Sequence, residues 1–184
     1  MSFSKKIVRS MVAVAMAGAA MIGSAVLIAA PAQAATTPVY YKLVGYASNK
    51  CLDVRREDGG GSGSRVQLWQ CFGSDNQRFT LYPVGKTSTG QTYFQIISQA
   101  PGHLCMQVRG DSFANGAQID EVGCSADLNQ YWRWGSGNLG YSLPLVSMRT
   151  GKCLDISGNS TANGAKVQQW DCNGTTAQYF RTVT

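Results

Sequence analysis

The sequence predicts an all-β fold made of three similar segments, and three observations carry this prediction. Six cysteines fall into three regularly spaced pairs, and short phrases around them recur in the same order. No helical period of apolar residues persists along the chain. Runs of aromatic and β-branched residues instead alternate with glycine, asparagine and proline, which is typical of short strands joined by turns.

The N-terminal residues 1–34 are interpreted as a secretory signal peptide. Three basic residues precede an uncharged stretch over residues 11–30, and Ala32-Gln33-Ala34 matches a small-x-small cleavage pattern. A retained membrane anchor is the alternative, because a stretch of this length could span a bilayer. The Ala- and Gly-rich composition and the cleavage pattern favour removal. We therefore expect a secreted, extracellular protein of residues 35–184 that does not insert into a membrane.

The net charge of the chain without the predicted signal peptide is small. The whole chain has 16 basic and 10 acidic residues, and removing three basic leader residues leaves 13 minus 10, or +3. A nucleic-acid surface needs clustered lysine and arginine. Here the basic residues are scattered, and Arg55-Arg56 is followed directly by Glu57-Asp58. Nucleic acid is therefore not expected as a partner.

All six cysteines lie after the predicted leader, and an even count in an exported chain indicates three disulfides. The spacings are 20, 19 and 19 residues, from Cys51 to Cys71, Cys105 to Cys124, and Cys153 to Cys172. Pairing within each segment is the simplest connectivity, and each closed loop should contribute about 3 kcal/mol.

No metal or cofactor is expected. The cysteines form no C-x-x-C clamp, and the single histidine, His103, has no partner at a ligand spacing. His103 follows Pro101-Gly102, so we expect an exposed turn residue.

The sequence around the cysteines repeats three times. The first and third copies share a Lys-Cys-Leu-Asp phrase, at residues 50–53 and 152–155, and a Val-Gln-x-Trp-x-Cys phrase, at 66–71 and 167–172. The middle copy is less similar. All three copies contain a Gln-x-aromatic phrase: Gln77-Arg78-Phe79, Gln130-Tyr131-Trp132 and Gln178-Tyr179-Phe180. We place the repeats at approximately residues 39–88, 91–138 and 139–184.

Short strands are expected over residues 40–46, 93–98 and 141–147, among others. Three copies are too few for a propeller, which has about four to eight blades. Three four-stranded units can instead close a barrel capped by hairpins. The predicted architecture is therefore a β-trefoil of three pseudo-symmetric repeats, each with one disulfide.

The recurring phrases resemble those of the ricin B-type lectin domain, a carbohydrate-binding module. The resemblance covers residues 39–184 nearly end to end, within a domain predicted at 35–184. It implies a non-catalytic lectin with up to three shallow pockets, often for galactose- or xylose-containing glycans. We expect a monomer whose partners are glycans or polysaccharides.

By this resemblance, the first repeat holds a complete pocket. Asp53 would accept two sugar hydroxyls, Trp69 would stack under the ring, and Asn76 would bond a hydroxyl. Gln67 and Gln77 would complete or brace the pocket. The alternative for Trp69 and Gln77 is a purely structural role.

The third repeat retains Asp155, Gln168, Trp170 and Gln178, but Ala177 stands where the first has an asparagine. Losing one hydrogen bond typically costs about 0.5 to 1.5 kcal/mol, so a weaker site is expected.

The second repeat lacks the pocket residues. Gln107, Asp120 and Val122 stand in place of the aspartate, glutamine and tryptophan, although Asn129 and Gln130 survive. We expect this repeat to be structural, with Trp132 in the core.

The two rival classes of function are an enzyme and a protein-binding module. Catalysis is not expected, because the chain offers no serine triad and Asp53 and Asp155 belong to separate pockets. A protein-binding trefoil such as a protease inhibitor is the main alternative, with residues 85–91 as the candidate loop. The Arg109-Gly110-Asp111 tripeptide is too short to indicate integrin binding.

Overall fold

The computed structural model describes residues 39–184, and the predicted signal peptide, residues 1–34, lies outside the described residues. The described part contains the strands β1 (Lys42–Gly45), β2 (Cys51–Val54), β3 (Val66–Trp69), β4 (Phe79–Lys86), β5 (Thr92–Ser98), β6 (Cys105–Val108), β7 (Ile119–Val122), β8 (Tyr131–Trp134), β9 (Leu143–Ser147), β10 (Cys153–Ile156), β11 (Ala165–Trp170) and β12 (Tyr179–Val183). Short 3-10 turns lie between them: η1 (Arg56–Asp58), η2 (Asp75–Gln77), η3 (Arg109–Asp111), η4 (Leu128–Gln130), η5 (Ser157–Asn159) and η6 (Thr176–Gln178). Among these described residues, no helix has the length and apolarity that a membrane span requires.

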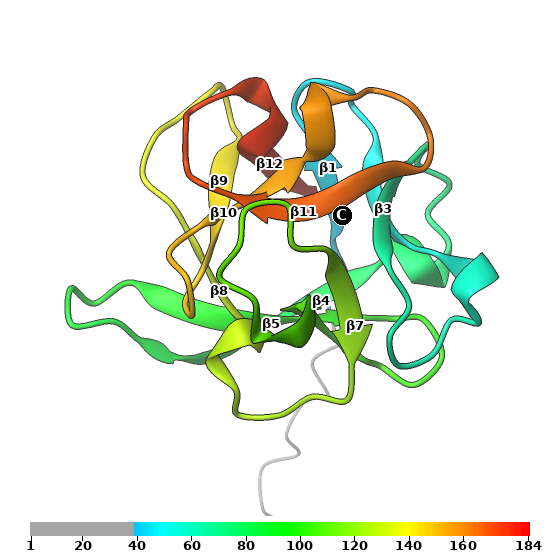
Figure 1. Cartoon of the computed structure of the whole chain (residues 1–184), viewed down its shortest axis with the longest axis horizontal. Coiled ribbons are helices and arrows are strands. Elements are labelled where there is room, and N and C mark those ends of the chain that lie inside the picture. The colour runs from blue at the N-terminus through cyan, green and yellow to red at the C-terminus, as the bar shows by residue number, and fades with distance from the viewer. Residues whose placement is uncertain (1–38) are drawn as a thin grey trace, which may run out of the picture. The chain divides into compact units, whose positions relative to one another are not determined.

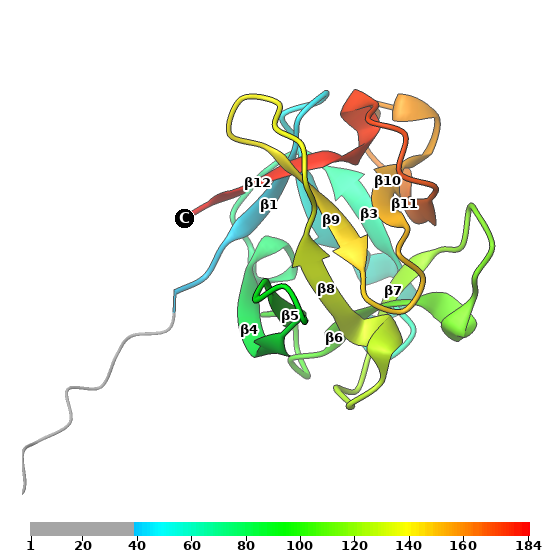
Figure 2. The ribbon, with the colours of Figure 1, turned by 90° about the vertical axis from the view of Figure 1, so that its left-hand side faces the viewer.

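The strands nearest the repeat boundaries close a barrel. Antiparallel pairs link β1 to β12, β12 to β9, β9 to β8, β8 to β5, and β5 to β4. Tyr41 and Phe79 exchange two backbone hydrogen bonds of 2.8 Å, which close the ring between β4 and β1. The first and last strands therefore lie side by side (Figure 2). The long β4–β5 hairpin extends away from the barrel (Figure 1).

The remaining strands form three hairpins, β2–β3, β6–β7 and β10–β11, which cap the barrel. This arrangement is the predicted β-trefoil, and the all-β fold is confirmed. Each hairpin carries one of the predicted disulfides, Cys51–Cys71, Cys105–Cys124 and Cys153–Cys172. The simplest connectivity is therefore confirmed.

A glycine turn from each repeat contacts the third strand of another repeat. Gly164 N donates to Leu68 O at 2.8 Å, Gly116 N donates to Gln169 O at 2.9 Å, and Gly63 N donates to Glu121 O at 2.6 Å. All three glycines have positive φ, a backbone conformation that residues with a side chain rarely adopt. The three hairpins are therefore tied together in a ring.

The Gln-x-aromatic phrase places its aromatic residue in the common core. Phe79, Trp132 and Phe180 are fully buried, as is Leu43. The indole of Trp132 also donates to Met106 O at 3.1 Å. The expectation that Trp132 belongs to the core is confirmed.

Glu121 is an unusual member of the interior. It pairs across the β6–β7 ladder at the position that Leu68 and Gln169 hold in the other hairpins. The residue is fully buried, and only Ser98 Oγ, at 2.6 Å, donates to its carboxyl among the described residues. Burial raises the pKa of Glu121 from 4.5 to about 7.

Replacing Glu121 with glutamine should remove most of a pH dependence of stability. Because the folded pKa lies above the unfolded value, the stability from the protonated carboxyl is fully present below about pH 4.5 and lost as pH rises through about 7. The free energy of unfolding of the parent should fall by up to about 3 kcal/mol across this window. Urea denaturation at several pH values measures this. Glu57→Gln, at an exposed position, is the control and should keep the slope of the parent; a Glu121→Gln protein with that same slope would contradict the prediction.

Candidate functional site

Asp53 lies at the centre of a polar network in the first repeat. It sits on β2 directly opposite Gln67 on β3, and its side chain is buried. Gln67 Nε2 donates to Asp53 Oδ1 at 3.0 Å, while Asn76 Nδ2 and Gln77 Nε2 each donate to Oδ2 at 2.8 Å. Three amide groups therefore fix the orientation of one carboxylate.

The electrostatic setting of Asp53 is dominated by burial. Burial raises the pKa of Asp53 above 3.8, and the hydrogen bonds from Gln67 and Gln77 and the charge of Arg56 partly oppose this rise. An ionised carboxylate offers about four acceptor positions. The amide bonds use three of them, so the ionised Asp53 can still accept a hydrogen bond from a ligand.

Gln77 acts as a brace. Besides bonding Asp53, its Nε2 donates to Gln70 O at 2.8 Å, and its Oε1 accepts from Phe72 N at 2.7 Å and Gly73 N at 3.2 Å. The side chain is fully buried. Its hydrogen-bonding capacity is used within the protein, which fits the bracing role that the sequence allowed.

Asn76 is also engaged internally. Its Nδ2 donates to Val54 O at 3.1 Å as well as to Asp53, and its Oδ1 accepts from Arg56 Nη2 at 3.1 Å and Ser74 Oγ at 2.7 Å. A sugar hydroxyl would have to replace or share one of these bonds. The predicted direct contact therefore stays a prediction, while the support that Asn76 gives to Asp53 is a structural fact.

A cavity of about 240 Å³ opens above this network. Its lining combines the predicted Asp53, Gln67, Trp69 and Asn76 with Arg56, Glu57, Phe72 and Ser74. Trp69 is half-buried, so part of its ring remains available to a ligand.

Phe72 is a lining residue that the sequence reasoning missed. Its side chain is 68% exposed, and it directly follows the second cysteine of the repeat. Ser125 and Asn173 occupy this place in the other two repeats. The signal in the sequence was that this repeat has an aromatic residue where the other two repeats have a polar one.

The third repeat reproduces the core of the network. Asp155 is buried and accepts from Gln168 Nε2 at 2.9 Å and Gln178 Nε2 at 3.1 Å. Trp170 is 39% exposed, whereas Ala177 is buried and supplies no third amide. The predicted residues thus come together here too, around a less constrained carboxylate.

A glycine turn from another repeat lies close to the tryptophan of each site. A Cβ atom added to Gly164 would lie 3.8 Å from Trp69 Cζ3, and one added to Gly116 would lie 3.8 Å from Trp170 Cζ3. Asn163, which precedes Gly164, accepts a hydrogen bond from Gln70 N at 3.0 Å. Both tryptophans therefore stand at the boundary between two repeats.

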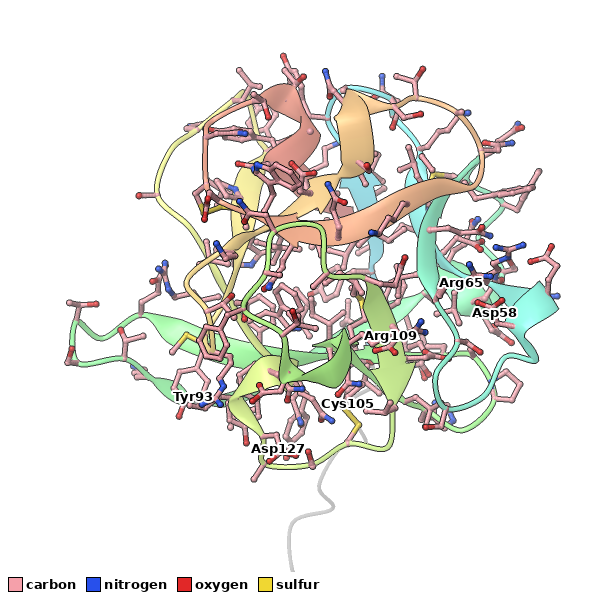
Figure 3. All side chains as sticks on the ribbon, viewed as in Figure 1. Asp58, Arg65, Tyr93, Cys105, Arg109 and Asp127 are labelled. Atoms are coloured by element: carbon pink, nitrogen blue, oxygen red, sulfur yellow. A yellow bond between two sulfur atoms is a disulfide. The ribbon has the colours of Figure 1, made fainter. Side chains whose placement is uncertain are left out.

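The second repeat fills the corresponding position with an ion pair. Arg109 Nε donates to Asp120 Oδ2 at 2.6 Å, and its Nη2 donates to Gly63 O at 2.8 Å. The side chain of Asp120 is 4% exposed and that of Arg109 is 46% exposed. Figure 3 places Arg109 beside β7. The prediction that this repeat is purely structural stays a prediction.

Other sequence candidates are placed as follows. His103 is exposed after a turn, as expected. Asp111, the last residue of the Arg-Gly-Asp tripeptide, accepts from Arg149 Nη2 at 2.6 Å, so both charged ends of the tripeptide are paired. Within residues 39–184, no group of three metal-ligating side chains comes together.

Comparison with a family model matches residues 39–180 to the ricin-type beta-trefoil lectin domain. Comparison of the sequence with curated proteins gave no match. Among solved structures, the chain is similar to ThreeFoil, a designed 3-fold symmetric protein, with a TM-score of 0.70 and 31% identity over 79% of this chain and 98% of that one.

Two further solved structures are similar. An exo-beta-1,3-galactanase from Clostridium thermocellum matches with a TM-score of 0.69 and 27% identity over 78% of this chain, which spans only 30% of the enzyme chain. A ricin B-like lectin from Macrolepiota procera, solved in complex with lactose, matches with a TM-score of 0.61 and 16% identity over 82% of this chain and 98% of that one. The similarity to the Macrolepiota procera lectin concerns the fold alone.

Removing Arg109 should destabilise the protein, because Asp120 would remain buried without its cation. We expect Arg109→Ala to lower the free energy of unfolding by about 1 to 3 kcal/mol. The double variant Arg109→Ala/Asp120→Gln should regain most of this loss, since the other two repeats hold glutamine there. Urea denaturation measures both. The control is Arg55→Ala, which removes an exposed pair with Glu57 and a long contact of 3.8 Å with Asp58, a carboxylate that Arg65 still holds; equal losses for Arg55→Ala and Arg109→Ala would disprove the role of the buried pair.

Proposed function

The chain belongs to the ricin-type β-trefoil lectin domain family, and from this premise we propose that the secreted protein, residues 35–184, is a lectin whose first repeat binds glycans most strongly and whose third repeat binds them more weakly. The observation that carries the proposal is the amide-braced carboxylate of Asp53 beneath a cavity beside Trp69. The protein would act outside the cell as a monomer.

The chemistry of this cavity suits a sugar. A pyranose presents neighbouring hydroxyls and one apolar face of C–H groups. A fixed carboxylate accepts hydroxyl protons in strong charge-assisted hydrogen bonds, the free oxygen of Gln67 can accept a further one, and the aromatic face of Trp69 can pack against the C–H face. Because these groups are held in place before the ligand arrives, little ordering opposes binding.

We propose galactose- or xylose-containing glycans as the ligands. Support for galactose comes from the 27% identity to an exo-beta-1,3-galactanase, although this chain spans only 30% of that enzyme. We propose that the lectin domain itself performs no catalysis, since the two braced aspartates, Asp53 and Asp155, lie in different hairpins.

The rival proposal is a protein-binding trefoil such as a protease inhibitor. Its candidate loop, residues 85–91, is the tip of the β4–β5 hairpin, where Thr87 N donates to Gln91 O at 2.8 Å. The tip residues between them are Ser88, Thr89 and Gly90. These small side chains offer no large anchor for a protease pocket, and the exposed Lys86 lies on β4, paired with Thr92, and not at the tip, so the lectin is favoured.

Binding should follow the rank of the pockets. We expect Asp53→Asn to remove most glycan binding, Asp155→Asn to remove less, and Gln107→Ala to change almost nothing. A glycan array on the mature protein selects the ligand, and calorimetry then measures affinity.

Because Asp53 holds three amide donors, its variant could be impaired in folding. Trp69→Ala, at a half-buried position, gives a second reading of the same pocket, and thermal denaturation checks that each variant is folded. Undiminished affinity in folded Asp53→Asn and Trp69→Ala proteins would refute the first-repeat site.

The two sites should act together on a surface. Linking two contacts raises the effective concentration of the second, so an immobilised polysaccharide should be bound at least about tenfold more tightly than a trisaccharide fragment of the same polymer. This excess should disappear in Asp155→Asn, which keeps the first pocket. Surface plasmon resonance on immobilised β-1,3-galactan or xylan measures it, with Gln107→Ala as the control. Retention of the full excess in Asp155→Asn would mean that the third repeat is not a working site.

A further inference from the structure

Two hollows adjoin the first-repeat cavity in sequence, and we infer that the three together form a groove that binds consecutive sugar units of one glycan chain. This inference rests on the proposed glycan binding by the Asp53 pocket and extends it from a single sugar to an oligosaccharide. The three cavities are called here the inner pocket, the middle hollow and the outer hollow.

The hollows adjoin one another, because neighbouring ones share lining residues. The middle hollow, of about 340 Å³, shares Arg56 and Asn76 with the inner pocket. The outer hollow, of about 380 Å³, shares Asp75 and Pro101 with the middle hollow. In the groove that we infer, a glycan chain leaves the inner pocket over Arg56, crosses the middle hollow and reaches the Pro101 turn of the second repeat.

Arg56 stands at the crossing between the inner pocket and the middle hollow. Asn76 Oδ1 holds its Nη2 at 3.1 Å, and Arg56 forms no ion pair with the described residues. A guanidinium has five N–H donors, so several remain for the hydroxyl or ring oxygens of a sugar. The positions matching Arg56 are Gly110 and Gly158 in the other repeats, which restricts this crossing to the first repeat.

The loop beside the middle hollow is held in shape by a bidentate ion pair. Arg65 Nε and Nη2 each donate to a carboxylate oxygen of Asp58 at 2.8 Å, and Arg65 N donates to Asp58 Oδ2 at 3.0 Å. Figure 3 shows these two side chains facing each other. They close the loop that contains Gly59 and Gly60, both of which line the middle hollow. This loop is one residue longer than its counterpart in the third repeat.

The outer hollow has the mixture of groups that a sugar needs. Tyr40 is 38% exposed and Pro101 is exposed, so both can pack against C–H groups. Asp75 and Arg78, paired at 3.6 Å, and the exposed His103 supply acceptors and donors around them. Because the middle hollow adjoins both the inner pocket and the outer hollow, the next units of the same glycan are the occupant that we infer.

Chain-length dependence tests the groove. The probes are galactose, β-1,3-galactobiose and β-1,3-galactotriose, with xylose, xylobiose and xylotriose as a second series, measured by calorimetry. All measurements use the Asp155→Asn background, so that the third repeat contributes little. For the series that binds, we expect the trisaccharide to bind about tenfold more tightly than the monosaccharide, because each added unit gains at least one hydrogen bond.

A matched pair of double variants locates the gain. Tyr40→Ala/Arg78→Ala removes one aromatic and one basic side chain from the outer hollow, and the ratio of trisaccharide to disaccharide affinity should fall to about one. The control, Tyr82→Ala/Lys86→Ala, removes the same kinds of side chain from the exposed β4–β5 hairpin and should keep the ratio of the parent.

The outcomes separate this inference from the proposed function. Monosaccharide binding with no gain on chain extension would overturn the groove and leave the lectin pocket standing. The groove would also be overturned if Tyr40→Ala/Arg78→Ala kept the ratio of trisaccharide to disaccharide affinity of the parent. Binding of no probe in either series would overturn both the proposed sugar class and the groove.

Discussion

Each repeat depends on one buried glutamine that joins the hairpin cap to the barrel. Gln77, Gln130 and Gln178 are all buried, and in each repeat the amide bonds backbone atoms on both sides of the second cysteine. Two residues later, the chain delivers a fully buried aromatic side chain to the core. In the first and third repeats, the same amide also bonds the aspartate of the site. Because a planar amide allows few geometries, the packing of the core and the position of the carboxylate are coupled.

The second repeat keeps the brace but has a different chemistry around it. Gln130 accepts from Gln95 Nε2 at 3.3 Å, and the strand position of the aspartate holds a neutral glutamine. Acid and amide have changed places across the β6–β7 ladder, where Gln107 faces Asp120. Since Asp120 is buried, its charge requires a cation, and Arg109 supplies one. The carboxylate of this hairpin is thus engaged with Arg109, so the pseudo-symmetry of the fold is not matched by symmetry of the polar networks in the three hairpins.

The features that could be predicted from the sequence are those set by the spacing of residues along the chain. Regular cysteine intervals yield the disulfides, and alternation along two strands places Asp53 opposite Gln67, because facing residues of a hairpin share one face. The hydrogen bonds of Gly164 with Leu68 and of Arg109 with Gly63 depend on how repeats pack against one another, which no local pattern encodes. The environment of Glu121 could not be predicted for the same reason, because its backbone pairs with Gly63 and Ser64 of the first repeat.

The rigidity of the first-repeat site limits what one sugar can gain there. Three amides hold Asp53, and the internal bonds of Asn76 and Gln77 are already satisfied, so a single ring meets few free polar groups: the remaining acceptor capacity of Asp53, the oxygen of Gln67 and the donors of Arg56. Binding to such a site costs little entropy, because its side chains are already ordered, and the fixed groups favour selectivity for hydroxyl geometry. The small number of contacts, however, keeps the binding free energy of a single sugar small. Further affinity must then come from contacts outside the pocket. Under the proposed function, two physical routes to these contacts exist: the adjoining hollows of the inferred groove, and the second braced carboxylate, Asp155, on another hairpin.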